Sequence, residues 1–304
     1  MMKRREAIKT SLKLGLALMT IDGFERAAAA DGRSLIVVVM DPLAAALSCP
    51  CVKGYAQRDY EQLAEYLERE LDRRVKVYFN ESLTAALEDE TAGRADLVIG
   101  KRSVVVAEAS HSKLGLKPIL ALSGKDGVTT QTGLLVVPAS DPAKTVADLK
   151  NYRIIFGPAH CEEKHAAAVA LLARNGVTVV GDVETCEACS DGATKILELG
   201  PDVRAATVIS SYAAPLLEGC GTIKKGDLRV IGTTQAVPFV TAFVSKTLNA
   251  TEQAAIEQAL LGVGDEPALL LALESKSGFL AEKSAKQAAR GPVDSTPDAQ
   301  KKSR

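Results

Sequence analysis

The chain has 304 residues, of which 47% are hydrophobic and 25% are charged, so it can bury a large core and is not wholly disordered. Its 37 Lys and Arg residues nearly balance 38 Asp and Glu residues, which excludes a basic surface for nucleic acid. Aromatic residues make up only 4% and Trp is absent, which argues against stacking platforms for bases or sugars.

The first 30 residues have the layout of an export signal. A basic stretch precedes an apolar run at residues 14–21, which is too short to span a membrane, and small residues follow before Asp31. The run RREAIK at residues 4–9 resembles the twin-arginine pattern R-R-x-F-L-K, with Ala for Phe and Ile for Leu. An ordinary secretory signal or an uncleaved anchor is the alternative. We therefore expect residues 1–30 to be a twin-arginine-like signal peptide and the protein to be periplasmic.

Predicted strands and helices alternate after this segment. Apolar runs predict strands at residues 34–40, 75–79, 96–99, 117–122, 133–138, 153–156, 177–180, 205–210, 228–232 and 239–244. Apolar spacing and composition predict helices at residues 55–71, 81–91, 162–174, 191–199, 251–262 and 266–275. Such alternation predicts an α/β fold with mostly parallel sheets.

The pattern contains a weak internal repeat. Residues 83–99 and residues 193–209 each run from a predicted helix, through a short Gly- and Asp-containing turn, into an apolar strand. Two similar α/β lobes follow from this repeat. Residues 281–304 are polar, rich in Lys and without periodicity, so we expect a disordered tail.

Several short motifs carry a family resemblance. They are GYAQRDY at residues 54–60, GRADLVIG at 93–100, GLLVVP at 133–138 and VISSY at 208–212. In this order they resemble the periplasmic solute-binding proteins of ABC importers, specifically the phosphonate-binding branch, over residues 34–275. The resemblance implies a two-lobed type II fold with a hinge. Residues 31–135 and 237–280 would form one lobe, and residues 136–236 the other.

The same resemblance implies a function without catalysis. The lobes would close on a small-molecule or ion ligand, of the phosphonate, phosphate or oxyanion type, and deliver it to a membrane permease. We expect the chain to act as a monomer. Where the phosphonate binders usually place a Ser/Thr-rich turn, residues 156–165 contain no hydroxyl and two carboxylates, which argues against a phosphonate or phosphate ligand.

Candidate ligand-binding residues follow from the expected strand ends. In open α/β sheets, ligands bind beyond the carboxyl ends of the strands, where helix N-termini also attract anions. The side chains expected in these loops are Cys49, Cys51, Tyr55, Lys101, His160, Cys161, Ser210, Ser211 and Tyr212.

The cysteines support a competing interpretation. Five of the six lie in loops expected to face one cleft, and Cys161 lies four residues before His165. Thiolates with imidazoles favour copper, zinc or an iron–sulfur cluster, and the candidate ligands are Cys49, Cys51, His160, Cys161, His165, Cys186 and Cys189. Two other interpretations fit an exported chain. The cysteines could form disulfides, including a pair between Cys220 and either Cys186 or Cys189, or they could be redox-active thiols. The alternative function is therefore an exported metal-binding or redox protein on the same fold.

Overall fold

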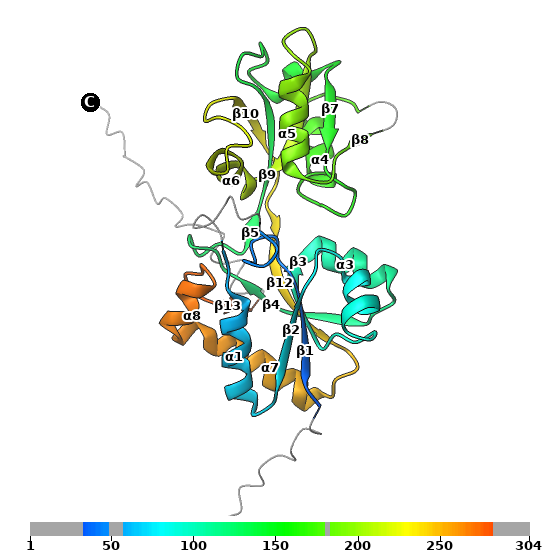
Figure 1. Cartoon of the computed structure of the whole chain (residues 1–304). Helices are drawn as coiled ribbons and strands as arrows, with labels where there is room; N and C mark the ends of the chain where they lie inside the picture. The colour runs from blue at the N-terminus through cyan, green and yellow to red at the C-terminus, as the bar shows by residue number, and fades with distance from the viewer. Residues whose placement is uncertain (1–32, 49–56, 180–182, 282–304) are drawn as a thin grey trace, which may run out of the picture. The chain divides into compact units, whose positions relative to one another are not determined.

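A computed structural model describes residues 33–48, 57–179 and 183–281 of the chain. The expected signal peptide, Cys49, Cys51, Tyr55 and the expected tail beyond residue 281 lie outside these residues. Two larger sheets and one small sheet organise the described part (Figure 1). Among the described residues, no helix combines the length and the apolar composition that a membrane crossing requires.

The first sheet has six strands in the order β13-β4-β12-β3-β1-β2. Its strands are β1 (Leu35–Met40), β2 (Val75–Phe79), β3 (Leu97–Lys101), β4 (Leu116–Leu122), β12 (Val240–Ser245) and β13 (Phe279–Leu280). Its helices are α1 (Tyr60–Leu71), α2 (Leu83–Ala85), α3 (Arg102–His111), α7 (Ala250–Gly262) and α8 (Pro267–Ala272), with a π-helical turn, η2 (Ala86–Glu90), and a 3₁₀ turn, η4 (Val263–Asp265).

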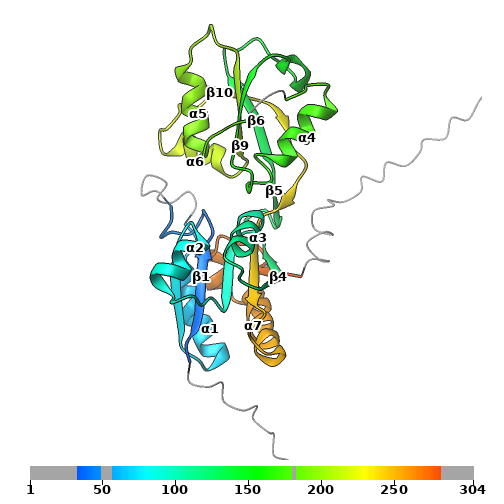
Figure 2. The ribbon, with the colours of Figure 1, turned by 90° about the vertical axis from the view of Figure 1, so that its right-hand side faces the viewer.

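Both faces of this sheet are buried. Successive side chains of a strand point to opposite faces, so Val37 and Val39 pack against α1 and α7 in one apolar cluster. Val38 and Met40 instead pack against α2 and α3 in another cluster. Figure 2 shows α1, α3 and α7 beside the strands of this sheet. This double burial explains why β1 is a continuous apolar run rather than an alternating one.

The second sheet has five strands in the order β10-β6-β9-β7-β8. They are β6 (Gly133–Pro138), β7 (Arg153–Phe156), β8 (Glu184–Thr185), β9 (Ala205–Ser210) and β10 (Leu228–Thr233). The helices η3 (Val146–Leu149) and α4 (Ala166–Arg174) cover one face, and α5 (Cys189–Glu198) and α6 (Ala213–Gly219) cover the other.

The chain passes between the sheets twice. It runs from β4 to β6 through β5 (Thr130–Gln131), and from β10 to β12 through β11 (Val237–Pro238). These two short strands pair with each other in antiparallel fashion. The two passages make the sheets mixed, not mostly parallel as the alternation predicts. β2-β1-β3 and β8-β7-β9 are parallel, but β12 and β6 run antiparallel to their neighbours.

Direction of entry explains the antiparallel strands. β12 begins at Val240, which pairs with Lys101 at the carboxyl end of β3. β6 begins at Gly133, which pairs with Ser210 at the carboxyl end of β9. A strand that enters its sheet at the carboxyl ends of its neighbours has to run against them.

Two sequence expectations differ from the structure. Residues 177–179 form no strand, because Val177 contributes to the core below α4 without joining a strand ladder, and the sheet edge is β8 instead. An apolar run indicates that a segment is buried, and a buried segment need not pair with a strand. The helix expected at residues 162–174 begins only at Ala166, since residues 162–165 form turns. Cys161 and His165 therefore lie in the approach to α4, not on one face of a helix.

Candidate functional site

Two strand ends bring the central polar side chains together. Lys101 is the last residue of β3 and Ser210 is the last residue of β9, so the two belong to different sheets. Both residues are buried. Each stands beside the first residue of a strand that has just crossed between the sheets. Both residues thus lie at strand ends, as the sequence predicts.

The carboxylate of Glu163 joins these two residues. Its Oε1 atom accepts hydrogen bonds from Lys101 Nζ at 2.5 Å and from Ser210 Oγ at 2.6 Å. The side chains of Lys101 and Glu163 are 6% and 0% exposed, so the ion pair is almost excluded from water. The other oxygen, Oε2, is buried and has no hydrogen-bond partner among the described residues. Buried polar atoms are nearly always paired, so this oxygen is an unusual feature of the site.

Two glycines, Gly133 and Gly157, allow the turn before α4 to pack closely against neighbouring backbone and side-chain atoms. A Cβ atom on Gly133 would meet the backbone oxygen of Glu163 at 2.1 Å. A Cβ atom on Gly157 would meet the Lys164 side chain at 2.6 Å. Both distances are far inside van der Waals contact. Glycine at these positions therefore fixes where Glu163 and Lys164 enter the site.

Lys164 places a second cation in the same region. It is 4% exposed, and its Nζ atom donates a hydrogen bond to the backbone oxygen of Glu187 at 3.1 Å. Burial alone would lower the pKa of Lys164, but the Cys189, Cys161 and Glu163 side chains around it outweigh burial and raise that pKa. Lys164 therefore stays charged at neutral pH.

Three thiols surround the two lysines. Burial raises the pKa of Cys161 although Lys101 and Lys164 oppose the shift, and burial also raises the pKa of Cys186. Cys189 accepts a hydrogen bond from the backbone N–H of Ser210 at 3.3 Å and lies 3.7 Å from its hydroxyl. Raised pKa values keep Cys161 and Cys186 in the neutral thiol form at pH 7, in contrast to activated cysteines.

The described cysteines are unpaired. Cys161, Cys186, Cys189 and Cys220 are all free thiols, so the disulfide expected between Cys220 and either Cys186 or Cys189 is absent from the structure. Cys186 and Cys220 each contact an oxygen atom of the chain instead. Cys186 Sγ lies 3.6 Å from the carbonyl oxygen of Phe156, and Cys220 Sγ lies 3.0 Å from the hydroxyl of Thr222.

The described residues do not fit a metal site. Across residues 33–48, 57–179 and 183–281, no three or more His, Cys, Asp or Glu side chains converge on one point. His165 bonds the backbone oxygen of Gly157 through Nδ1 at 2.8 Å, and its ring lies beside Phe156. A copper, zinc or iron–sulfur centre needs three or four convergent ligands. Cys49 and Cys51 lie outside the described residues.

An aromatic stack extends the site towards the end of β1. Tyr212 stacks on Phe239 with ring centroids 5.1 Å apart, and the Arg58 guanidinium lies 5.8 Å from the same Phe239 ring. Arg58 in turn forms a buried ion pair of 2.8 Å with Asp41, and Tyr60 donates a 2.6 Å hydrogen bond to the same carboxylate oxygen. Of these residues, only Tyr212 was expected from the sequence.

Two expected residues have other roles. Ser211 Oγ accepts a hydrogen bond from the backbone N–H of Thr132 at 3.2 Å, next to β5, so it fixes the crossing segment. His160 is partly buried and lies near Glu108. Burial alone would raise the pKa of Glu108, but hydrogen bonds from Thr84 and Ser82 outweigh burial and lower that pKa. Among the described residues, the side chain of Glu163 accepts hydrogen bonds from Lys101 and Ser210, not from Ser211 or His160.

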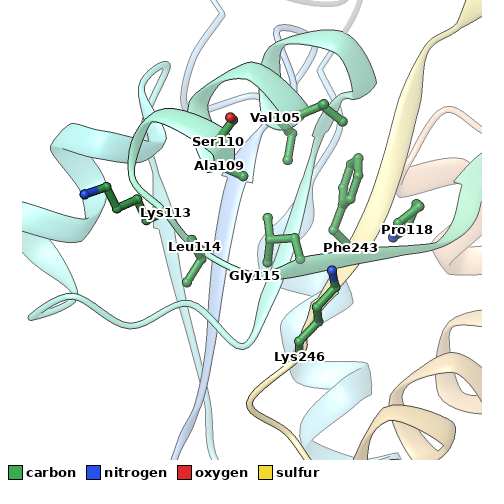
Figure 3. A pocket seen from close by; sticks show the side chains of 11 residues that line it. Val105, Ala109, Ser110, Lys113, Leu114, Gly115, Pro118, Phe243 and Lys246 are labelled. Atoms are coloured by element: carbon green, nitrogen blue, oxygen red, sulfur yellow. The ribbon is translucent and has the colours of Figure 1, made fainter.

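A surface hollow of about 330 Å³ lies elsewhere (Figure 3). It is formed by the carboxyl end of α3, the start of β4 and the end of β12, and residues such as Ala109, Leu114 and Phe243 line it. Of the expected ligand-binding residues that the structure describes, none lines this hollow. We therefore place the candidate site at Lys101, Glu163, Lys164, Ser210 and Tyr212.

Sequence reasoning missed Glu163 and Lys164 as site residues. The available signal was the composition of residues 156–165, which contain two adjacent carboxylates and no hydroxyl where an oxyanion-binding turn was expected. That signal did not distinguish Glu162, which is exposed, from Glu163, which is buried.

A comparison with protein-family models identifies the family of this chain. The sequence model of a family described as "ABC transporter, phosphonate, periplasmic substrate-binding protein" matches residues 54–286, which is more than half of the chain. No curated protein matches in sequence.

Solved structures share the fold at low sequence identity. A binding protein component of an ABC phosphonate transporter from Pseudomonas aeruginosa has a TM-score of 0.60 and 14% identity, covering 85% of this chain and 86% of that one. PhnD1 from Prochlorococcus marinus, solved with methylphosphonate, has a TM-score of 0.60 and 12% identity, covering 86% and 98%. XAC2383 from Xanthomonas citri, bound to ATP, has a TM-score of 0.61 and 13% identity, covering 84% and 94%.

Proposed function

Because the chain belongs to the family of periplasmic substrate-binding proteins of phosphonate ABC transporters, we propose that it captures a small solute at the Lys101–Glu163–Ser210 site and delivers it to a membrane permease. The two-lobed fold and the periplasmic location follow from the family. The observation that supports this site is the convergence of Lys101 and Ser210, from two different sheets, on one buried carboxylate. Capture by lobe closure needs residues from both sheets to meet the same group.

The geometry also suggests how the site responds to a ligand. The crossing strands β5 and β11 pair with each other and lead into β6 and β12, which begin beside Ser210 and Lys101. A change in their backbone angles would move the two strand ends relative to each other, as hinge residues do in binding proteins. The proposed action involves binding and release, without a covalent step. The chain acts in this proposal as a monomer, which light scattering in solution checks.

Calorimetry and thermal-shift assays test the capture function. The purified chain is titrated with methylphosphonate, an aliphatic sulfonate, ATP and a set of amino acids, since two solved neighbours hold ATP and methylphosphonate and a third is described as an aliphatic sulfonate binding protein. At least one solute is expected to bind and to raise the melting temperature. For that solute, Ser210→Ala should weaken binding at least tenfold, whereas the exposed Ser140→Ala should not. Binding of no solute, or binding that ignores Ser210, contradicts the proposal.

Export by the twin-arginine route belongs to the same proposal. It is supported by the basic RREAIK run and the weakly apolar stretch that follows it. Residues 1–30 fused to a folded reporter should direct it to the periplasm, and replacing both Arg4 and Arg5 with Lys should abolish export. A fusion whose export survives that replacement, or that requires an unfolded reporter, would indicate the ordinary secretory route.

A further inference from the structure

Lys101 Nζ and Ser210 Oγ are suited to an oxyanion. An ammonium and a hydroxyl both donate hydrogen bonds, and charge-assisted bonds of this kind are the strong contacts of carboxylate and phosphate recognition. The two donors reach the same point from the carboxyl ends of β3 and β9. Both residues are 5% exposed or less, so the point where they meet is dry.

The group at this point belongs to the chain itself. Glu163 Oε1 takes both donors, at 2.5 Å from Lys101 and 2.6 Å from Ser210, and the residue is 0% exposed. A carboxylate oxygen with an ammonium on one side and a hydroxyl on the other has the surroundings expected for an oxygen of a bound anion. While Glu163 holds this position, an external oxyanion cannot take the same two donors.

The second oxygen distinguishes this pair from an ordinary structural ion pair. Glu163 Oε2 is buried without a partner among the described residues. A buried ion pair stabilises a fold only when hydrogen bonds also satisfy its remaining lone pairs. In the buried pair of Arg58 with Asp41, both carboxylate oxygens of Asp41 accept hydrogen bonds. In Glu163, by contrast, only Oε1 accepts hydrogen bonds, from Lys101 and Ser210, and Oε2 has no partner among the described residues. The site therefore satisfies the two donors but not the whole carboxylate.

The surrounding charges favour an anion once Glu163 is removed. Lys101 and Lys164 are both nearly buried cations, and Lys164 donates to a backbone oxygen instead of a carboxylate. Among the described residues, Glu163 is the acidic group paired with Lys101. With Glu163 ionised, a bound dianion would face a carboxylate at close range; without it, two cations and a hydroxyl would remain for the dianion.

We propose that Glu163 is a built-in anion that occupies the oxyanion position of the site and so determines its specificity against phosphonate-type and phosphate-type ligands. This inference rests on the proposed function, because it assigns one position within the proposed ligand site. It also explains the composition of residues 156–165, in which a carboxylate side chain is present and hydroxyls are absent.

Inorganic phosphate and methylphosphonate are the probes that test the proposal. Calorimetry compares the full chain with Glu163→Ala, and both probes should bind the variant at least tenfold more tightly than the unchanged chain. Glu162→Ala is the matched control, because Glu162 is the neighbouring carboxylate but is exposed; its affinities should equal those of the unchanged chain. Adding Lys101→Met to Glu163→Ala should remove the gain.

A second variant and a second readout cover a loss of folding. Glu163→Gln keeps the side-chain shape and removes the charge, so it should bind phosphate more tightly than the unchanged chain but less tightly than Glu163→Ala. Formate, which supplies a carboxylate, should raise the melting temperature of Glu163→Ala more than that of the unchanged chain or of the variant that also lacks Lys101.

Two results would contradict the proposed role of Glu163. The proposal is overturned if the unchanged chain binds phosphate or methylphosphonate as tightly as Glu163→Ala and Glu163→Gln do, or if formate stabilises every variant equally. These results leave the capture function standing, since that function is judged by whether the unchanged chain binds any solute through Ser210. Failure of the solute panel alone leaves the comparison between variants intact.

Discussion

Lys101 and Glu163 are 62 positions apart in the chain, yet their side chains form a 2.5 Å ion pair that is almost completely withdrawn from water. Lys101 ends a strand of the six-stranded sheet, whereas Glu163 precedes the helix α4 that covers the five-stranded sheet. This contact therefore couples the electrostatics of two separately packed cores. Its energetics can be measured directly.

Replacing one member of the Lys101–Glu163 ion pair should destabilise the folded protein. Lys101→Met leaves a buried carboxylate without its cation, and we expect it to lower the free energy of unfolding by about 3–5 kcal/mol. Glu163→Gln should also destabilise, and the double variant should lose less than the sum of the two. Urea denaturation checks this cycle. The pair of Lys125 with Glu274, whose side chains are 65% and 17% exposed, is the control, because ion pairs open to solvent contribute about 1 kcal/mol or less. Additive losses at Lys101 and Glu163 would contradict the coupling.

Gly133→Ala should disturb the turn that carries Glu163. The added methyl would meet the Glu163 backbone oxygen at 2.1 Å, and a backbone atom cannot rotate away as a flexible side chain can. We expect a loss of about 1–3 kcal/mol, typical of overpacking. Gly115→Ala is the control, since its methyl would meet the Lys246 side chain at an ordinary 3.5 Å. Equal melting temperatures for the two variants would show that the turn tolerates the displacement.

Acid should weaken the edge of the second sheet. Hydrogen bonds from Arg153 and Lys195, the first being the larger effect, lower the pKa of Glu184 to about 2. A carboxyl group with a lowered pKa in the folded state stabilises the fold above its ordinary pKa of 4.5, and this stabilisation disappears as the pH falls towards 2.

Glu184→Gln should therefore be less stable than the unchanged chain at pH 7, and the difference should shrink between pH 4.5 and pH 2. Melting temperatures measured across that range check the sign. The groups are partly exposed, so the difference should be small and should decrease in high salt. A difference that grows as the pH falls would have the wrong sign for a lowered pKa.

The thiols should differ in their rates of alkylation. Burial raises the pKa of Cys161 and also shields its sulfur, so both effects slow its reaction with iodoacetamide in the native protein. Cys220 is less buried and should react sooner. Peptide mass spectrometry of native samples gives the order. In urea without reductant, all four described cysteines should be alkylated; a cysteine that labels only after reduction would reveal a disulfide that the structure lacks.

Much of the fold could be predicted from local sequence. The apolar runs identify β1, β6, β7 and β9, because a strand that is largely buried on both faces leaves few polar positions. The same reasoning failed at residues 177–179, where burial occurs without strand pairing. It also missed the antiparallel strands, since their direction depends on where the chain enters each sheet.

The sequence by itself determined that Lys101 and Ser210 lie at strand ends, because an apolar run and the residue that ends it are local features. Only the tertiary structure decided that both side chains meet Glu163. The register of β12 on β3 and of β6 on β9, together with the close approach permitted by Gly133, brings them together. Such contacts join residues far apart in the chain, and no local pattern distinguishes the buried Glu163 from the exposed Glu162 beside it.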